Sequence, residues 1–196
     1  MSETNGDSNG TAGGWTVAGT LTAYPALDRI DLLAEPVAEA LRVLDAADIA
    51  RCAVVEIDPE LADTATFCEH YSAPMSGSGN CVVVAGKRSG ESRYAACVVL
   101  ATTRADVNGV LRRRLDVRKA SFAPMDDAVA QTGMEYGGIT PLGLPEGWPV
   151  LLSAEVAGAP ELVIGSGFRH SKLLVPGDLL AKLPGAEVVP NLARPT

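Results

Sequence analysis

Hydrophobic and polar positions along the chain follow two different periods, and together they predict a mixture of helices and strands. Apolar residues recur every three or four positions from Pro36 to Ala47, which predicts an amphipathic helix with Pro36 at its start. The apolar run from Cys52 to Ile57 predicts a strand. A second helix is expected to begin at Asp58-Pro59 and to continue to about Tyr71.

The second half of the chain continues this mixture with shorter elements. A buried strand beginning at Asn80, a turn at 87–90 and a strand over 94–101 predict a hairpin. Further elements are expected as helices over 105–115, 123–133 and 176–183, and as strands over 150–154, 161–164 and near Glu187. Because helices and strands do not alternate strictly, we expect an α+β fold in which helices wrap a curved, mixed and barrel-like β-sheet.

The first 34 residues differ in composition from the rest. Residues 1–14 are polar and glycine-rich, so we expect a disordered tail there. Residues 15–34 form a strand-like extension in this prediction, because Trp15 to Tyr24 alternates apolar and polar residues as an edge strand does. Residues 35–196 are expected to form one domain, since 196 residues of which 47% are hydrophobic suffice for a single core.

Composition and charge restrict the function. A net charge of −8 gives no general attraction to phosphates, so any contact with RNA must be local. No segment has the length of a membrane span or the pattern of a signal peptide, so we expect a cytoplasmic protein without a membrane partner. The four cysteines are too widely spaced to hold zinc, and nucleotide-binding glycine motifs are absent, so we expect free thiols, no metal and no cofactor.

The segment 137–143, Gly-Gly-Ile-Thr-Pro-Leu-Gly, is the most distinctive in the chain. Its three glycines permit close approach of another backbone or of a ligand, while Pro141 fixes its own φ and favours an extended Thr140. Such a loop offers main-chain amides rather than side chains. A binding loop and a tight turn that closes the sheet are the two interpretations of this pattern.

Together with Asn80–Ala85 and Gly165–Arg169, this loop resembles the YbaK/prolyl-tRNA-synthetase-associated family of aminoacyl-tRNA editing domains. The resemblance covers roughly residues 35 to 192, and it includes the order of strand, helix, glycine loop, glycine-rich turn and a Pro176-Gly-Asp-Leu helix start. It implies a barrel-like α+β domain that acts in trans as an aminoacyl-tRNA deacylase. The implied substrate is a transfer RNA (tRNA) carrying a small, wrongly attached amino acid, and an aminoacyl-tRNA synthetase is an implied partner.

The resemblance also indicates which residues form the site. It places Asn80 where the family's functional lysine stands, and asparagine donates a hydrogen bond without carrying a charge. The amides of Gly137, Gly138 and Ile139 are expected to hold the ester carbonyl, since one such donor contributes roughly 3 to 4 kcal/mol. The residues expected to contact the substrate are Thr64, Tyr71, Thr140, Pro141, Gly165, Ser166, Gly167, Arg169 and His170.

Asn80 leaves two hypotheses open. Either the chain is a deacylase in which Asn80 orients the ester or the ribose, or it is a catalytically weakened module that binds aminoacyl-tRNA or a nucleotide. A structural role is an equally good interpretation of Asn80, in which its side chain hydrogen-bonds to main-chain amides of the preceding linker. A basic stretch with Arg112, Arg113, Arg118 and Lys119 is the candidate contact for the tRNA 3′ end, and a solvated helix face is its alternative. The oligomeric state is left open.

Overall fold

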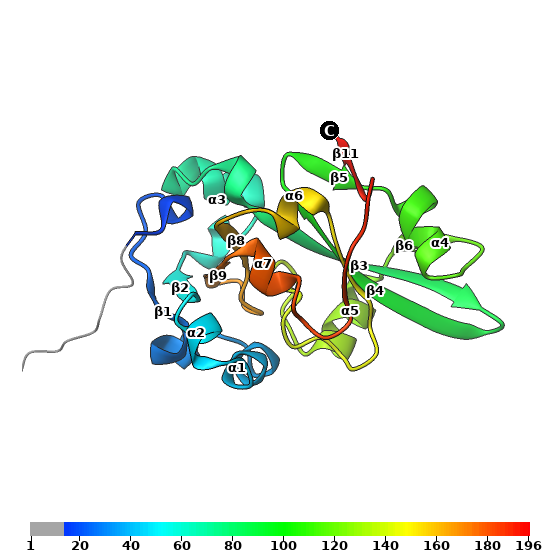
Figure 1. Ribbon diagram of the computed structural model, residues 1–196, viewed down its shortest axis with the longest axis horizontal. Coiled ribbons are helices and arrows are strands. Elements are labelled where there is room, and N and C mark those ends of the chain that lie inside the picture. Colours follow the sequence, from blue (N-terminus) through cyan, green and yellow to red (C-terminus); the bar gives the residue numbers. More distant parts are fainter. Residues whose placement is uncertain (1–13) are drawn as a thin grey trace, which may run out of the picture.

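The computed structural model describes residues 14–196, and its strands form two larger sheets and a small one (Figure 1). The first larger sheet has the order β1-β2-β9-β8, the second the order β10-β7-β4-β3-β6, and β11 pairs with β5. The strands are β1 Tyr24–Pro25, β2 Ala53–Glu56, β3 Gly79–Arg88, β4 Glu91–Leu100, β5 Thr103–Ala105, β6 Ala120–Phe122, β7 Val150–Leu152, β8 Leu162–Gly165, β9 Ser171–Val175, β10 Ala186–Val188 and β11 Ala193–Pro195. The helices are α1 Glu35–Arg42, α2 Ala46–Ile49, α3 Thr64–Tyr71, α4 Arg112–Arg114, α5 Met125–Thr132, α6 Ala154–Ala157 and α7 Gly177–Leu180.

The pairing of the strands confirms a mixed α+β fold. β3 and β4 form the predicted antiparallel hairpin, from Gly79 opposite Leu100 to Arg88 opposite Glu91. β7 runs parallel to both β4 and β10. An isolated bridge between Ser78 and Val163 links the start of β3 to β8, so the two larger sheets meet one residue before β3 begins. The barrel-like closure of the sheet stays a prediction.

The core lies on both faces of the four-stranded sheet. One face packs against the five-stranded sheet and α1, where Val54, Val98 and Leu173 are buried. The other face is covered by α3 and the first described residues, and it buries Phe67 and Leu174. Because neighbouring residues of a strand point to opposite faces, the residue before Leu173 lies on the α3 side of the sheet.

The strand predicted from Trp15 to Tyr24 is wrong except at its end. Residues Thr16–Ala18 form a 3-10 turn whose first amide and hydroxyl donate to the Glu161 carboxylate. Gly19 then takes a φ of 60° and the amide of Thr20 donates to the carbonyl of Tyr71, so this segment bonds to the end of α3 instead of to a strand. Only Tyr24–Pro25 joins the sheet edge, beside β2. Of the predicted tail, residues 1–13 lie outside the described part.

Two helices predicted as continuous are each divided by an aspartate. The helix expected over 36–47 ends at Arg42, and α2 starts anew after Asp45, whose side chain accepts from the amide of Asp48. The helix expected over 58–71 is a 3-10 turn followed by α3, and Asp63 caps α3 by accepting from the amide of Ala65. A capping carboxylate satisfies amides that have no partner within the helix, so each aspartate starts a new helix.

Most of the remaining predicted elements occur with shorter bounds. The helix predicted over 123–133 is α5, which ends at a left-handed Gly133. The helix predicted over 105–115 is a π-helical turn, Val107–Leu111, followed by α4. The sequence analysis does not predict strand β9, whose apolar pattern Lys172 interrupts. It also misses four short elements, β5, β6, α6 and β11. Within residues 14–196, no helix combines the length and the apolar character that crossing a membrane requires.

Candidate functional site

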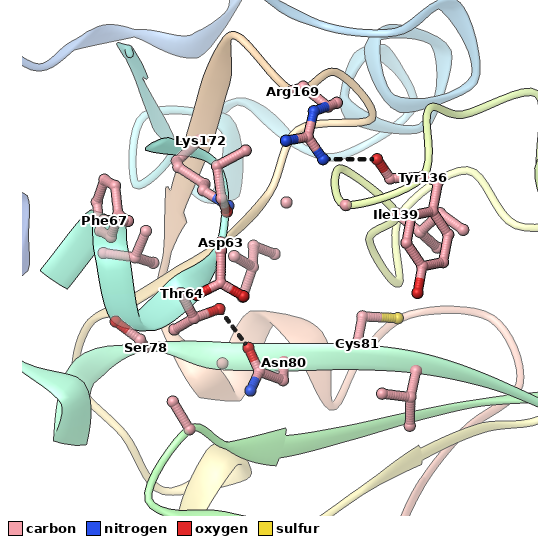
Figure 2. Close-up of a pocket in the computed structure, with 18 of the residues that line it drawn as sticks. Asp63, Thr64, Phe67, Ser78, Asn80, Cys81, Tyr136, Ile139, Arg169 and Lys172 are labelled. Atoms are coloured by element: carbon pink, nitrogen blue, oxygen red, sulfur yellow. Dashed lines mark hydrogen bonds between the residues drawn. The ribbon is translucent and has the colours of Figure 1, made fainter. Parts of the chain in front are cut away.

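A cavity of about 660 Å³ opens where the two larger sheets meet. Its walls come from the first residues of β3, the end of β8, the start of α3 and the segment that follows α5 (Figure 2). Ligand sites in proteins typically have volumes of roughly 300 to 1,000 Å³. The cavity thus collects residues from both halves of the chain and has the size of a ligand site.

One wall of the cavity is built by Asp63, Thr64 and Asn80. The cap at Asp63 begins α3 at Thr64, and the Thr64 hydroxyl donates to Oδ1 of Asn80 at 2.7 Å (Figure 2). Asn80 is half-buried at the start of β3, opposite Val99 of β4. It does not satisfy the amides of the preceding linker. Its side-chain oxygen is fixed by Thr64, and within residues 14–196 no protein acceptor takes its Nδ2 amide.

Two cations lie on another side of the cavity, and neither is neutralised by a carboxylate. Lys172 of β9 is only 7% exposed, and its Nζ donates to the carbonyl oxygen of Ala62 at 2.7 Å. The Arg169 guanidinium donates to the carbonyls of Pro59 and Tyr136 at 3.0 and 3.3 Å. In the described part of the chain, neither side chain has an acidic oxygen within 4.0 Å. Both cations therefore keep their charge available to a ligand.

Burial changes the protonation of Lys172. Loss of solvent is the main cause, and repulsion from Arg169 is the second, and together they lower the pKa of Lys172 to about 8. Nζ lies over the ring of Phe67, 5.7 Å from the ring centre. The ammonium is thus still the main form at neutral pH, and it loses its proton far more readily than an exposed lysine.

Two of the three glycine-loop residues whose amides were predicted to hold the ester carbonyl line the cavity, and the third does not. Gly137 and Ile139 line the cavity, and within residues 14–196 their amides have no protein acceptor. Gly138 does not line it, and its amide donates to the carbonyl of Glu135 at 2.9 Å. A side chain at Gly138 would collide with the backbone of Phe168. The expected role of the Gly138 amide is therefore corrected: this amide is occupied, and the glycine is needed for close packing.

The two loop residues after Ile139 are buried away from the cavity. Thr140 is fully buried and its hydroxyl has no hydrogen-bond partner among the described residues. Pro141 is buried as well, and neither residue lines the cavity. The structure thus buries Thr140 and Pro141 on the side of the loop that faces away from the cavity lining.

Four other predicted contacts also lie outside the cavity lining, whereas Gly165 and Arg169 do line it. Ser166 is buried and shares a hydrogen bond of 2.7 Å with Ser171, which ties the turn between β8 and β9 together. Gly167 takes a φ of 89° and packs against Ala34. The remaining two are aromatic: His170 stacks on Phe168, and Tyr71 lies against Phe67.

The basic stretch is separate from the cavity wall. Arg112 lies at the start of α4, Arg113 is exposed beside it, and Arg118 and Lys119 are exposed just before β6. Figure 1 shows α4 and α3 at opposite ends of the longer dimension of the molecule. Because β6 itself ends at the cavity with Phe122, Arg118 and Lys119 are the members of this stretch nearest to the site in sequence.

The cysteines are free thiols, as predicted. Cys52, Cys68 and Cys97 are buried, whereas Cys81 is half-buried and lines the cavity beside Asn80. Loss of solvent raises the pKa of the Cys81 thiol, so it stays protonated at neutral pH and is a poor nucleophile. Within residues 14–196, no three His, Cys, Asp or Glu side chains gather as a metal site would require.

Among the cavity residues that sequence reasoning missed, the charged and aromatic ones are Asp63, Phe122, Tyr136 and Lys172. The sequence did carry a signal for Lys172. Burying a lysine at the start of the apolar Lys-Leu-Leu-Val run costs desolvation free energy, so its presence there points to a function. Asp63 carried a signal too, since an aspartate before Thr-Ala-Thr is a typical helix cap. Nothing in the sequence places Phe122 and Tyr136 on one cavity.

Comparison with known proteins gives results for the family and for the fold. A family model described as the aminoacyl-tRNA editing domain matches residues 58–183, a range that contains every side of the cavity. No curated protein matches the chain. Solved structures resemble the chain in their fold as well. One is the crystal structure of a protein proposed to be a trans-editing enzyme for prolyl-tRNA synthetase, with a TM-score of 0.66, 22% identity, and coverage of 80% of this chain and 94% of that chain.

The second similar structure is that of the hypothetical protein APE2540. Its TM-score is 0.67 at 18% identity, and the alignment covers 82% of this chain and 100% of that chain. At such low identities, the two structures show a shared fold. They support the α+β architecture with mixed sheets that the strand pairing shows here.

Proposed function

Because the chain belongs to the aminoacyl-tRNA editing domain family, we propose that it is an aminoacyl-tRNA deacylase that acts in trans. Its substrate in this proposal is a tRNA whose 3′ end carries a small, wrongly attached amino acid. The observation that carries the proposal is the cavity in which two cations without carboxylate partners share the lining with free amides of the glycine loop. The protein with the similar fold that is proposed to act in trans-editing supports it.

The chemistry is the hydrolysis of an ester. The oxygen of a water molecule bonds to the carbonyl carbon and the bond between that carbon and the ribose oxygen breaks. One proton of the water ends on the ribose oxygen, which leaves a free amino acid and a ribose hydroxyl. Negative charge develops on the carbonyl oxygen during this step, so donors fixed around that oxygen accelerate it.

In this proposal the Lys172 ammonium and the amides of Gly137 and Ile139 donate hydrogen bonds to the carbonyl oxygen of the ester. The bond from Lys172 to the carbonyl of Ala62 uses one of three N–H groups, so two remain for the substrate. Lys172 keeps its proton throughout, since its part is to stabilise charge. It supplies the positive charge that asparagine at position 80 cannot supply.

The wall of Asp63, Thr64 and Asn80 positions the rest of the substrate in this proposal. Thr64 fixes the side-chain oxygen of Asn80, which leaves the Nδ2 amide to donate to the ester or to the ribose. Asp63 carries the carboxylate of this wall, and in this proposal it binds the ammonium group of the amino acid. Arg169 is assigned to the phosphate next to the terminal ribose, since it is a half-buried cation held by two carbonyls.

The second candidate function is binding without hydrolysis. It is favoured by the uncharged Asn80 and by the Gly138 amide, which is occupied by Glu135. Such a module would hold an aminoacyl-tRNA in the same cavity and would leave its ester intact. The two functions differ in turnover and share the ligand.

Deacylation of a panel of mischarged tRNAs, led by alanyl- and cysteinyl-tRNA(Pro), tests the proposal. The wild type is expected to hydrolyse at least one of them faster than buffer does, and Asn80→Ala is expected to be slower because the ester is less well oriented. Asn108→Ala is a matched control, since Asn108 lies on the π-helical turn and does not line the cavity. A silent wild type that gains activity in Asn80→Lys would instead establish the binding module.

A further inference from the structure

Aromatic side chains are scarce in this protein, and two of them are exposed at the same cavity. The chain has three phenylalanines, four tyrosines and two tryptophans. Phe122 is 60% exposed at the end of β6, and Tyr136 is 54% exposed after α5, yet both line the cavity. Figure 2 shows the Tyr136 ring on the side of Ile139 and Cys81, across the opening from Thr64. Exposure of large apolar side chains around one opening is typical of a binding surface.

The two rings have faces that no other aromatic group covers. Most other aromatic side chains of the described part are paired, as in the stack of Tyr94 on Trp148 with ring centres 4.9 Å apart. Within residues 14–196, neither Phe122 nor Tyr136 takes part in an aromatic pair or in a cation–π contact. Their ring faces are therefore available to a flat ligand.

Positively charged residues accompany both aromatic residues. The Arg169 guanidinium donates to the main-chain carbonyl of Tyr136, so a cation without a carboxylate partner is fixed to the backbone of that residue. Arg118 and Lys119 directly precede the strand that carries Phe122, and in the described residues neither makes an ion pair. Aromatic faces combined with cations along the same path suit a single-stranded nucleic acid, whose bases stack while its phosphates bind the cations.

We propose that Phe122 and Tyr136 form a stacking rim that binds the bases of the single-stranded 3′ end of the tRNA. This inference rests on the proposed function, because it assigns the part of the substrate that lies outside the reacting ester. Every base offers a flat face, so the rim holds the 3′ end without selecting a sequence. It also explains how an acidic protein binds RNA locally, with few cations and two rings at one opening.

A fluorescent tRNA tests the rim without any need for turnover. The probe is a deacylated tRNA in which 2-aminopurine replaces the terminal adenine, since stacking on an aromatic ring quenches this base. The wild type is expected to quench the probe in a saturable manner. Phe122→Ala and Tyr136→Ala are each expected to weaken binding about 5- to 100-fold, as the loss of one base stack predicts, and to reduce the quenching.

Ring-retaining and distant variants are the controls. Phe122→Tyr and Tyr136→Phe keep a ring and are expected to bind as the wild type does. Val188→Ala removes an apolar side chain that is 43% exposed on β10 and does not line the cavity, so it is expected to change nothing. Unchanged affinity and quenching in both alanine variants would overturn the rim. So would altered sedimentation of these variants with intact RNA binding, because the rings would then join two protein copies.

The two experiments distinguish a failure of the stacking rim from a failure of the proposed hydrolysis. Quenching that depends on both rings, in a protein that deacylates no substrate, would support the rim and refute the deacylase. Deacylation of tRNA that is as fast in both alanine variants as in the wild type, with unchanged Kd for the probe, would refute the rim and leave the deacylase standing.

Discussion

The cations beside α2 and the cations in the cavity are held in two different ways. Beside α2, the Lys182 ammonium lies 3.0 Å from both oxygens of Asp48, and Arg51 bonds to Asp178. In the cavity, Lys172 and Arg169 bond to main-chain carbonyls instead. A carbonyl fixes the position of a cation without cancelling its charge, so the cavity lining carries two cations against the single carboxylate of Asp63, within a protein whose net charge is −8.

The pKa shifts follow the same division. At the surface, the hydrogen bond from Arg51 lowers the pKa of Asp178, as expected for a carboxylate paired with a cation. In the cavity, burial and then the neighbouring Arg169 lower the pKa of Lys172, which is the opposite of what an ion pair does to a lysine. A buried charge without a partner lowers stability, and strained or costly groups gather where function requires them. The comparison therefore points to Lys172 as the side chain whose charge is used.

The largest expected effect is on the rate of hydrolysis. Lys172→Met removes the charge and keeps the length of the side chain, so we expect deacylation to slow by about 10²- to 10³-fold, as for loss of one oxyanion donor. Lys182→Met removes a neutralised cation and is expected to leave the rate unchanged. The measurement is single-turnover deacylation with saturating enzyme. The wild-type rate is also expected to fall as the pH rises through about 8, because Lys172 then loses its proton.

One result would contradict this prediction, and a second would refine it. A rate for Lys172→Met equal to that of the wild type would show that the ammonium does not act on the ester. A rate for Lys172→Arg as low as that for Lys172→Met would show that charge alone is insufficient and that the exact position of Nζ decides.

The second effect concerns stability, and its sign depends on pH. Between the folded pKa of about 8 and the ordinary value of 10.5, the unfolded chain binds the proton that the folded protein has released. The free energy of unfolding therefore rises with pH in this window, by about 3 kcal/mol at most from Lys172, and the burial cost is fully present below about pH 8. Lys172→Met is expected to lack this rise and to be as stable as the wild type, or more so, near neutral pH.

Urea denaturation of both proteins at about pH 7 and about pH 10 measures this difference. Other groups titrate in the same range, so the quantity of interest is the difference between the wild type and Lys172→Met at each pH. A variant less stable than the wild type by more than about 2 kcal/mol near pH 7 would contradict the prediction. It would show that Lys172 is retained for its bond to the Ala62 carbonyl, since a buried acceptor left without a donor costs about 1 to 3 kcal/mol.

The sequence predicted the family and the order of the longer elements, because both depend on local patterns. The glycine loop, α5 with its Gly133 stop, and the β3–β4 hairpin are each coded within a short segment, and each is observed. Asn80 was placed correctly at the start of a buried strand that faces a cavity. Glycine and proline residues at the ends of these elements were therefore sufficient to predict where they start and stop.

The site residues were harder to predict, because their positions depend on contacts between distant segments. Lys172 faces the cavity because β9 pairs with β8 in a register that sets it opposite Gly165. A shift of one residue would turn it to the opposite face. The role of Gly138 was ambiguous for a related reason. A glycine that admits a ligand and a glycine that admits a neighbouring strand look the same in a sequence, and here Phe168 occupies the space.

The smallest expected effect belongs to the surface pair. Lys182→Met breaks the pair with Asp48, yet Arg51 still donates to the same carboxylate at 3.2 Å. The Lys182 side chain is 56% exposed, and exposed ion pairs contribute about 0.2 to 1 kcal/mol, so we expect the free energy of unfolding to fall by no more than about 1 kcal/mol. Urea denaturation at low and high salt is the measurement, since screening should remove most of the difference. A loss well above 1 kcal/mol that persists in high salt would contradict this prediction, because it would mean that the buried Asp48 carboxylate depends on Lys182 for its neutralisation. The pair beside α2 would then behave as a buried ion pair and would differ less from the cavity than we expect.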